Sequence, residues 1–269
     1  MSLAKVFLVL TVFTLVIYFG ICYLLYKNQK SMMFHPESLS KDHIFTFPFQ
    51  FEEVTLNPEK DVHLHAIFAK TDLPKKGVVL YHHGNAGSLK DWGMVAPDFL
   101  KLGYDVLIPD FRGYGKSTGK LTERALTKDA QLFYAYLKEQ YTDKEIVLYG
   151  RSMGTGITTN LARTVSCRLV ILETPFLSFP AMASEMLPPV LPIKQLLSFK
   201  LDNAGNLPSI EAPVYLIHGT VDELVPYQHS KELAAILKRP DVLYTIEGAG
   251  HNNISEFPEY HKLIGELLN

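Results

Sequence analysis

A serine stands between two glycines in the stretch IVLYGRSMGTGI, residues 146–157. The first four residues of this stretch are typical of a buried strand, and the residues after the glycines favour a helix. Ser152 therefore lies on an expected strand-to-helix turn, flanked by Gly150 and Gly154. In so tight a turn there is no room for a Cβ atom at the glycine positions, and the hydroxyl is held out from the edge of the sheet. A helix N-cap or an ordinary turn would also use a serine here, so the rest of the chain must decide whether Ser152 is a nucleophile.

A serine hydroxyl becomes a good nucleophile when a base removes its proton and a third group orients that base. Two downstream loops, each after an expected strand, contain such groups: Asp222 in GTVDELVP and His251 in EGAGHNN. Reacting residues gather beyond the carboxyl ends of the strands in a parallel sheet. The order serine, aspartate, histidine, with gaps of 70 and 29 residues, is that of enzymes with a nucleophile elbow. We predict that Ser152, Asp222 and His251 form a catalytic triad.

Other acids and histidines also lie near expected strand ends. Glu173 remains an alternative for the acid, Asp110 is expected to hold the turn PDFRGYGKS together, and Glu223 is expected to be a solvated charge. A histidine at a strand end more often hydrogen-bonds a loop than catalyses. Structural roles are therefore expected for His82, His83 and His218.

The negative charge that develops on an attacked carbonyl oxygen needs hydrogen-bond donors, usually two backbone N–H groups. The first is expected to be the N–H of Met153, directly after the serine, and the second that of Asn85 in the loop YHHGNAGSL. Gly84 would let this loop approach the ligand closely; a simple glycine turn is the alternative. The chemistry requires neither a metal ion nor an organic cofactor.

The elements that must position these residues alternate along the chain. A hairpin is expected first, from Phe45–Leu56 and Val62–Ala69 around the turn NPEKD. The expected strands that follow are Gly77–His82, Tyr104–Pro109, Glu145–Tyr149, Arg168–Leu172, Pro213–His218 and Asp241–Ile246. The expected helices between and after them are Ser88–Leu102, Leu121–Tyr141, Ser152–Val165, Gln228–Leu237 and Glu256–Leu268. This pattern predicts an α/β fold with an eight-stranded, mostly parallel sheet covered by helices on both faces.

The alternation fails at residues 173–212, between the sixth and seventh expected strands. Four prolines break long helices there without making the segment polar: Pro180, Pro188, Pro189 and Pro192. The segment is either an irregular excursion packed against the core or a short mobile lid over an apolar pocket. The lid is the preferred interpretation, because many of its apolar residues have no sheet face to join.

The N-terminus differs from the rest of the chain. From Val6 to Tyr26 there is no charged residue, and this length suffices to cross a hydrocarbon core of roughly 30 Å at about 1.5 Å per residue. We predict a single-pass membrane anchor in residues 1–30, a short linker NQKSMMFHPES, and a catalytic domain in residues 31–269. A cleaved signal peptide and a buried soluble helix are the alternatives. Lysines flank the span on both sides, so the positive-inside rule only slightly favours a cytoplasmic domain.

Composition narrows the function further. A chain of 269 residues that is 47% hydrophobic and 20% charged suits one large globular domain or two small ones. The net charge of −2 and the lack of a clustered basic face argue against a nucleic-acid partner. Two cysteines, Cys22 and Cys167, suggest neither a metal site nor a disulfide framework.

The motifs together resemble the α/β-hydrolase superfamily, and within it membrane-anchored serine hydrolases. The resemblance extends from about Gly77 to the C-terminus and rests on HGNAG, DFRGYGKS, GRSMG, HGTVDELVP and GAGHN. It implies a hydrolase of carboxylic esters or thioesters, and its relatives include lysophospholipases and protein depalmitoylases. The expected substrates are lipid-derived: a lysophospholipid, a monoacylglycerol or an S-acylated protein. The short segment 173–212 departs from members with a large cap domain.

Two other functions stay open. A peptidase of the prolyl-oligopeptidase kind would share the same core, although no propeller or other gating domain is evident. A membrane-tethered binding protein could keep the fold without turnover, but it would have no chemical need for a complete triad. Because no candidate catalytic residue precedes Met32, we expect a chain shortened to about that point to remain active.

Overall fold

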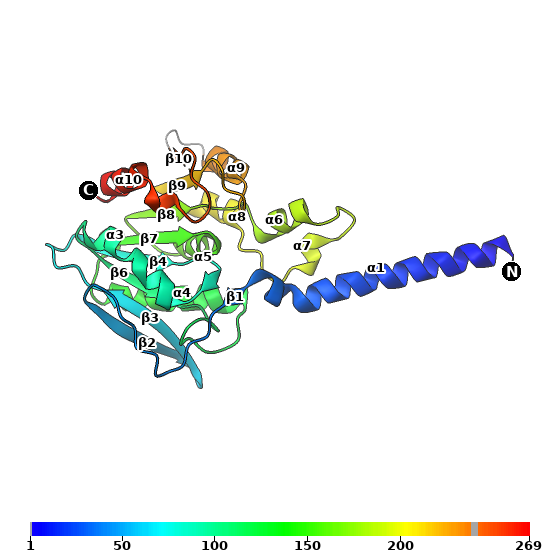
Figure 1. Cartoon of the computed structure of the whole chain (residues 1–269), viewed down its shortest axis with the longest axis horizontal. Helices are drawn as coiled ribbons and strands as arrows, with labels where there is room; N and C mark the ends of the chain where they lie inside the picture. The colour runs from blue at the N-terminus through cyan, green and yellow to red at the C-terminus, as the bar shows by residue number, and fades with distance from the viewer. Residues whose placement is uncertain (1, 238–241) are drawn as a thin grey trace.

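The computed structural model describes residues 2–237 and 242–269, and its centre is a twisted eight-stranded sheet (Figure 1). The strand order is β10-β9-β8-β7-β4-β6-β3-β2. The strands are β2 (Phe51–Glu59), β3 (Val62–Ala69), β4 (Gly77–His82), β6 (Tyr104–Pro109), β7 (Ile146–Arg151), β8 (Leu169–Glu173), β9 (Val214–Gly219) and β10 (Leu243–Ile246). Strand β3 is antiparallel to β2 and to β6, and the other neighbours are parallel. The predicted fold class is confirmed.

Helices cover both faces of the sheet, because the strands are apolar on both sides. In β7, Leu148 packs into one core cluster, whereas Val147 and Tyr149 pack into the other, as the two-residue period of a strand requires. The first face is covered by α4 (Glu123–Lys138), α5 (Met153–Ala162) and α9 (Tyr227–Leu237). The second is covered by α2 (Leu89–Trp92), α3 (Pro97–Leu100) and α10 (Pro258–Leu268). Single 3₁₀ turns occupy Gly93–Val95, Asp143–Glu145, Leu207–Ser209 and Ile254–Glu256.

The parallel strands β4, β7, β8, β9 and β10 all end at one edge of the sheet. The loops after β4, β7, β9 and β10 contain the predicted site residues, so the topology places these residues at a common edge.

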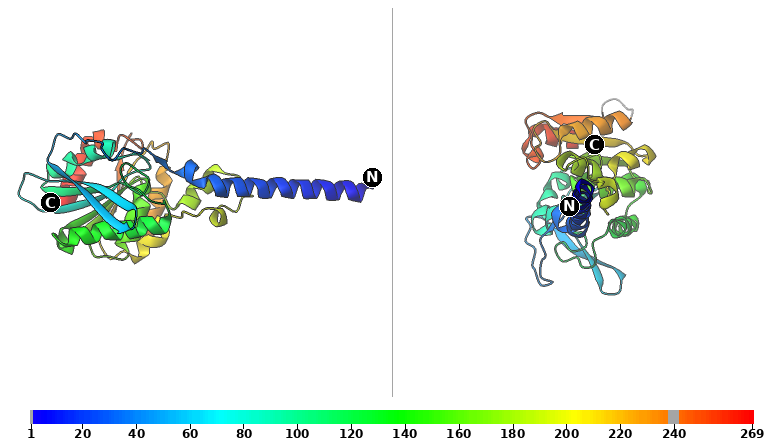
Figure 2. Two further views of the ribbon diagram at one scale, coloured as in Figure 1. Left: turned by 90° about the horizontal axis from the view of Figure 1, so that it is seen from below. Right: turned by 90° about the vertical axis from the view of Figure 1, so that its right-hand side faces the viewer.

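Helix α1 (Leu3–Met33) projects from the domain, with its N-terminal end far from the sheet (Figures 1 and 2). Its apolar side chains are largely exposed, and its mean hydropathy reaches 2.5 over 18 residues. By length and composition it could cross a membrane, and a signal sequence has the same features. The helix continues to Met33, so the predicted linker 28–38 is helical over residues 28–33 and non-helical over residues 34–38. The helix stops only at Phe34, because Pro36 disfavours helical backbone before it.

After α1 the chain pairs with the loop that follows β4. Strand β1 (His35–Pro36) is parallel to β5 (Ala86–Gly87), and the N–H of Glu37 donates to the carbonyl oxygen of Gly87 at 3.0 Å. The C-terminal end of α1 is thereby tied to the loop that contains Asn85.

The segment 173–212 contains three short helices and one 3₁₀ turn. These helices are α6 (Phe179–Met186), α7 (Ile193–Leu196) and α8 (Asn203–Asn206). Ser178 caps α6 by accepting the N–H of Ala181, and Leu187 is the C-cap, directly before Pro188. Helices α6 and α7 reach out from the domain towards α1 (Figure 1).

Two expected elements differ from the structure for local reasons. The helix expected over Ser88–Leu102 is divided into α2, a 3₁₀ turn and α3, because Pro97 has no N–H for a continuous helix. The first strand begins at Phe51 instead of Phe45, after Pro48, which cannot donate to a sheet ladder. The expected strand from Asp241 starts outside the described residues, and β10 begins at Leu243.

Candidate active site

Ser152 occupies a strained turn between β7 and α5. Its backbone has φ +52° and ψ −120°, a conformation that costs a non-glycine residue on the order of 1–3 kcal/mol. A Cβ atom at Gly154 would collide with the carbonyl oxygen of His82, and one at Gly150 would crowd Thr158 and the backbone of α5. Both glycines are therefore required for the close packing of this turn.

His251 and Asp222 lie in hydrogen-bonding sequence behind Ser152. The Nε2 atom of His251 is 3.0 Å from Ser152 Oγ, and its Nδ1 atom is 2.7 Å from Asp222 Oδ2. A carboxylate can only accept, so Nδ1 carries the proton and Nε2 is free to accept the serine proton. The structure thus brings together the three residues that the sequence pattern selected, in the arrangement that serine activation requires.

The Asp222 carboxylate is fully buried and accepts four hydrogen bonds. Oδ1 accepts the N–H groups of Leu224 and Val225 at 2.9 and 2.8 Å, and Oδ2 accepts from His251 and from His218 Nε2 at 3.1 Å. Burial alone would raise the pKa of Asp222, but these hydrogen bonds lower it well below its ordinary value. The acid therefore stays ionised at neutral pH.

His218 does more than support a loop. Its Nε2 proton is shared between Asp222 and the carbonyl oxygen of Val225, and its Nδ1 atom contacts Ser230 Oγ at 2.6 Å. This buried ring helps to orient the carboxylate through Oδ2, the same oxygen that accepts from His251. The sequence did place His218 at the end of β9, four residues before Asp222, but it did not reveal that the two side chains meet.

The alternative acids do not face His251. Glu173 pairs with Arg151, with 3.1 Å between Oε1 and Nε, and accepts the hydroxyl of Tyr149. Asp110 accepts the N–H of Leu89 with its carboxylate and the hydroxyl of Ser117 with its carbonyl oxygen, which agrees with a role in its turn. Glu223 is exposed.

Arg151 was missed by sequence reasoning, although it lies within the elbow. It is the last residue of β7, directly opposite Glu173 in the register of β8. Its guanidinium also donates to the carbonyl oxygen of His251 at 3.2 Å. A charged residue at the end of an otherwise buried strand needs a partner, and this was the available signal. Through this hydrogen bond Arg151 connects the serine turn to the histidine loop.

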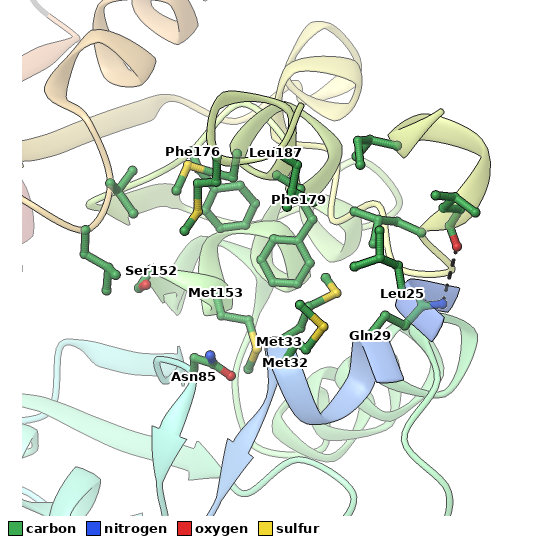
Figure 3. Close-up of a pocket in the computed structure, with 18 of the residues that line it drawn as sticks. Leu25, Gln29, Met32, Met33, Asn85, Ser152, Met153, Phe176, Phe179 and Leu187 are labelled. Carbon is green, nitrogen blue, oxygen red and sulfur yellow. Dashed lines mark hydrogen bonds between the residues drawn. The ribbon is translucent and has the colours of Figure 1, made fainter. Parts of the chain in front are cut away.

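The two predicted oxyanion donors lie beside Ser152 (Figure 3). Met153 is the first residue of α5, and N–H groups in the first turn of a helix have no partner within the helix. Asn85 is held by Tyr114, whose hydroxyl donates to the Asn85 carbonyl oxygen at 2.7 Å. Tyr114 comes from the DFRGYGKS motif, and sequence reasoning gave it no role. A Cβ atom at Gly84 would lie 2.9 Å from the Trp92 ring, so glycine is required there.

An apolar cavity of about 360 Å³ opens beside Ser152. Three parts of the chain line it: the loops around Ser152 at the carboxyl ends of the strands, the segment 173–212 and the end of α1 (Figure 3). The lining residues are Leu25, Gln29, Met32, Met33, His35, Asn85, Ser152, Met153, Phe176, Phe179, Met182, Ala183, Met186, Leu187, Ile193, Leu196, Leu197, Leu224 and Val225.

The end of α1 is fastened to the segment 173–212 by a buried side chain. Gln29 donates to the carbonyl oxygen of Leu196 at 3.3 Å and accepts the N–H of Ser198 at 2.6 Å. Lys30 donates to the carbonyl oxygen of Leu121 at 2.8 Å. The last turns of α1 are therefore part of the cavity wall, and a chain shortened to Met32 would lose Leu25 and Gln29 from that wall. The expectation that such a chain keeps its activity stays a prediction.

Among the described residues, no three histidine, cysteine, aspartate or glutamate side chains are arranged to hold a metal ion. The groups gathered around Ser152 are backbone N–H groups, which can stabilise an oxyanion, and His251, which can accept a proton.

Comparison with known proteins agrees with this fold. A family model described as alpha/beta hydrolase fold matches residues 77–195. The esterase Pf2001 of Pyrococcus furiosus superposes with a TM-score of 0.68, at 26% identity, over 88% of this chain and 96% of its own. The protein belongs to the α/β-hydrolase superfamily, as the motifs predicted.

Similar curated proteins include alpha/beta hydrolase domain-containing protein 17B of Homo sapiens, 29% identical over 76% of this chain and 70% of the relative. Protein 17C of Xenopus tropicalis is 29% identical over 77% of this chain and 66% of the relative. The chain thus spans about two thirds of the length of these relatives. Together with the esterase structure, they support hydrolase activity.

Proposed function

We propose that this protein is a serine hydrolase that cleaves carboxylic esters or thioesters of lipid-derived acyl groups through an acyl-enzyme on Ser152. The observation behind the proposal is the position of Ser152: its hydroxyl contacts His251 on one side and an apolar cavity on the other. An acyl chain in that cavity would bring its carbonyl carbon to the nucleophile.

The reaction follows from the hydrogen bonds. Ser152 Oγ attacks the carbonyl carbon while its proton passes to His251 Nε2, and the charge of the imidazolium is balanced by Asp222. The N–H groups of Met153 and Asn85 donate to the oxyanion, which lies at the positive end of α5. Collapse of the tetrahedral intermediate breaks the bond to the leaving oxygen or sulfur, which takes the proton from His251.

Water then completes the cycle. His251 removes a proton from water, the hydroxide attacks the acyl carbon, and the second tetrahedral intermediate collapses, which breaks the bond to Ser152 Oγ and releases the carboxylic acid. Ser152 recovers its proton from His251. No other group is required for proton balance.

The cavity supports a lipid-derived substrate. Apart from Gln29, His35, Asn85 and Ser152, every residue that lines it is apolar. Five of the lining residues are methionines, and flexible methionines suit chains of varied shape. Membrane anchoring by α1, which we also propose, would place the cavity beside a supply of such chains.

The test is labelling with a fluorophosphonate, followed by hydrolysis of p-nitrophenyl esters of short and long acyl chains. We expect the wild type to be labelled and Ser152→Ala to be unlabelled, with kcat lower by about 10⁴- to 10⁶-fold. The matched control is Ser166→Ala, because Ser166 is exposed and, within the described part of the chain, only its carbonyl oxygen forms a hydrogen bond. Long esters should be hydrolysed with higher kcat/KM than short ones.

Three results would contradict the proposal. Labelling of Ser152→Ala at the wild-type rate would mean that another residue is the nucleophile, and a folded wild type that is never labelled would favour a binding protein. Faster turnover of matched amides than of esters would favour a peptidase. Pyrococcus horikoshii acylaminoacyl peptidase shares the fold, at 16% identity and over 41% of its own chain, so this comparison bears on the fold alone.

A further inference from the structure

The loop between α6 and α7 has an uncharged, exposed apolar surface. Residues 186–193, MLPPVLPI, contain no polar side chain; we call them the insertion tip. The side chain of Met186 is 80% exposed and that of Val190 is 68% exposed. Single exposed apolar residues are common in soluble proteins, but contiguous exposed apolar surface marks a site of contact with a protein, a ligand or a membrane. In the insertion tip Met186, Pro188, Pro189 and Val190 are exposed, whereas Ile193 is buried.

The insertion tip lies beside the apolar part of α1, as Figures 1 and 2 show from different sides. The hydroxyl of Tyr18 donates to the carbonyl oxygen of Val190 at 3.0 Å. Tyr18 lies eight residues before Tyr26, at the end of the charge-free stretch, which is about 12 Å along a helix. If α1 crosses a bilayer with a hydrocarbon core of roughly 30 Å, Val190 lies at the depth of the acyl chains.

The backbone of the insertion tip is suited to this depth, where every unpaired N–H is costly. Three of its eight residues are prolines, which have no N–H. The N–H groups of Leu187, Leu191 and Ile193 donate to the carbonyl oxygens of Ala183, Pro188 and Leu191. Among the described residues, the N–H of Val190 is the one in this loop without an acceptor, and its carbonyl oxygen is the one that accepts from Tyr18.

Charged side chains resume on either side of this apolar region. Glu185 precedes the insertion tip and pairs with His229, at 2.8 Å between Oε1 and Nε2. Lys194 follows it, and Lys27 follows the charge-free part of α1. Lysines at the ends of apolar segments are typical of the membrane interface.

We propose that the insertion tip enters the hydrocarbon of the same bilayer as α1, so that the cavity opens sideways into the membrane. The cavity extends from Ser152 to Leu25 and Gln29 on α1, past Phe179 and Met33 (Figure 3). An acyl chain would pass from the bilayer between α1 and the segment 173–212 to reach Ser152. This route rests on the proposed function, whereas insertion of the tip into the bilayer does not.

The test is depth-dependent fluorescence quenching of the full-length protein in phosphatidylcholine vesicles. With Cys22 and Cys167 replaced by alanine, a single Val190→Cys is labelled with the dye NBD. Matched controls are Leu15→Cys on α1 and Leu73→Cys on the loop between β3 and β4, which replace side chains that are 48% and 49% exposed. Quenchers are lipids with a nitroxide on the acyl chain and, separately, aqueous iodide.

We expect the dye at Val190 to lose most of its fluorescence to the nitroxide lipid and to be protected from iodide, as at Leu15. The dye at Leu73 should show the reverse. Quenching of the Val190 dye by iodide and not by the lipid would overturn the proposal, and so would a Leu15 dye outside the bilayer.

Ester hydrolysis measured on the same vesicles separates the two proposals. Lipid quenching at Val190 without hydrolysis would support the inserted tip while contradicting the proposed function. Hydrolysis with iodide quenching would leave the function standing and reject the inserted tip.

Discussion

Replacing Asp222 by asparagine tests the hydrogen-bond logic of the site most directly. The two carboxylate oxygens have different partners: Oδ1 accepts two backbone N–H groups, from Leu224 and Val225, and Oδ2 accepts from His251 and His218. In the Asp222→Asn variant the single oxygen must take the place of Oδ1, because two fixed donors point at it. The amide NH₂ then takes the place of Oδ2.

That exchange replaces the hydrogen-bond acceptor beside His251 Nδ1 by a donor. An NH₂ group donates to His251 Nδ1, so the ring proton moves to Nε2, which faces Ser152 at 3.0 Å. A protonated Nε2 cannot accept the serine proton. In a serine protease the wrong tautomer lowers kcat by about 10⁴-fold, which corresponds to about 5.4 kcal/mol of transition-state free energy. We expect a loss of this size in kcat with little change in KM, because Asp222 does not line the cavity.

The assay is steady-state hydrolysis of a p-nitrophenyl ester, with urea unfolding to confirm that the variant is folded. Glu223→Gln is the matched control, since it makes the same oxygen-to-nitrogen exchange on the neighbouring, exposed side chain. The reasoning is refuted if folded Asp222→Asn keeps kcat within about tenfold of the wild type, a loss of less than 1.4 kcal/mol, or if Glu223→Gln loses as much activity.

Other expectations follow from single contacts. Tyr114→Phe removes the hydrogen bond that positions Asn85. If the bond's contribution of about 1 kcal/mol is lost from the transition state, kcat/KM should fall by roughly fivefold; an unchanged kcat/KM in the folded variant would show that the oxyanion loop does not need this bond. Burial lowers the pKa of His82 to about 3. The stability that depends on neutral His82 is therefore complete above the unfolded pKa of about 6.5 and is lost as pH falls towards 3, by up to roughly 5 kcal/mol. The unfolding free energy of His82→Asn should fall less steeply with acid than that of the wild type, and equal slopes would contradict the burial argument. Gln29→Leu leaves two backbone groups of the segment 173–212 without their partner, which should lower the unfolding free energy by about 1–3 kcal/mol. It should also lower kcat/KM for long esters more than for short ones. Equal effects on both would argue against a role of α1 in the cavity wall. Deletion of residues 2–31 should impair long esters in the same way, and full activity of the shortened chain would show that the cavity does not need α1.

The positions of Ser152, Asp222 and His251 could largely be predicted from the sequence, because they depend on local turns and strand ends. The turn around Ser152 is set by Gly150 and Gly154, whose missing side chains leave room for His82 and Thr158. The places of Asp222 and His251 followed from strand ends, since parallel strands share one edge and every loop after them opens at that edge. The two-residue period within strands, together with proline and glycine between elements, was enough to predict the sheet.

Contacts between distant segments required the tertiary structure. Gln29 meets Leu196 and Ser198 across 167 and 169 residues, and no periodic pattern in either segment indicates the other. The residues after position 27 resembled a linker because they are polar on average, yet they continue α1 and form a cavity wall. Local patterns determined which residues could react, whereas the packing of α1 against the segment 173–212 decided what surrounds Ser152, because such packing depends on the shapes of two surfaces and not on the composition of either.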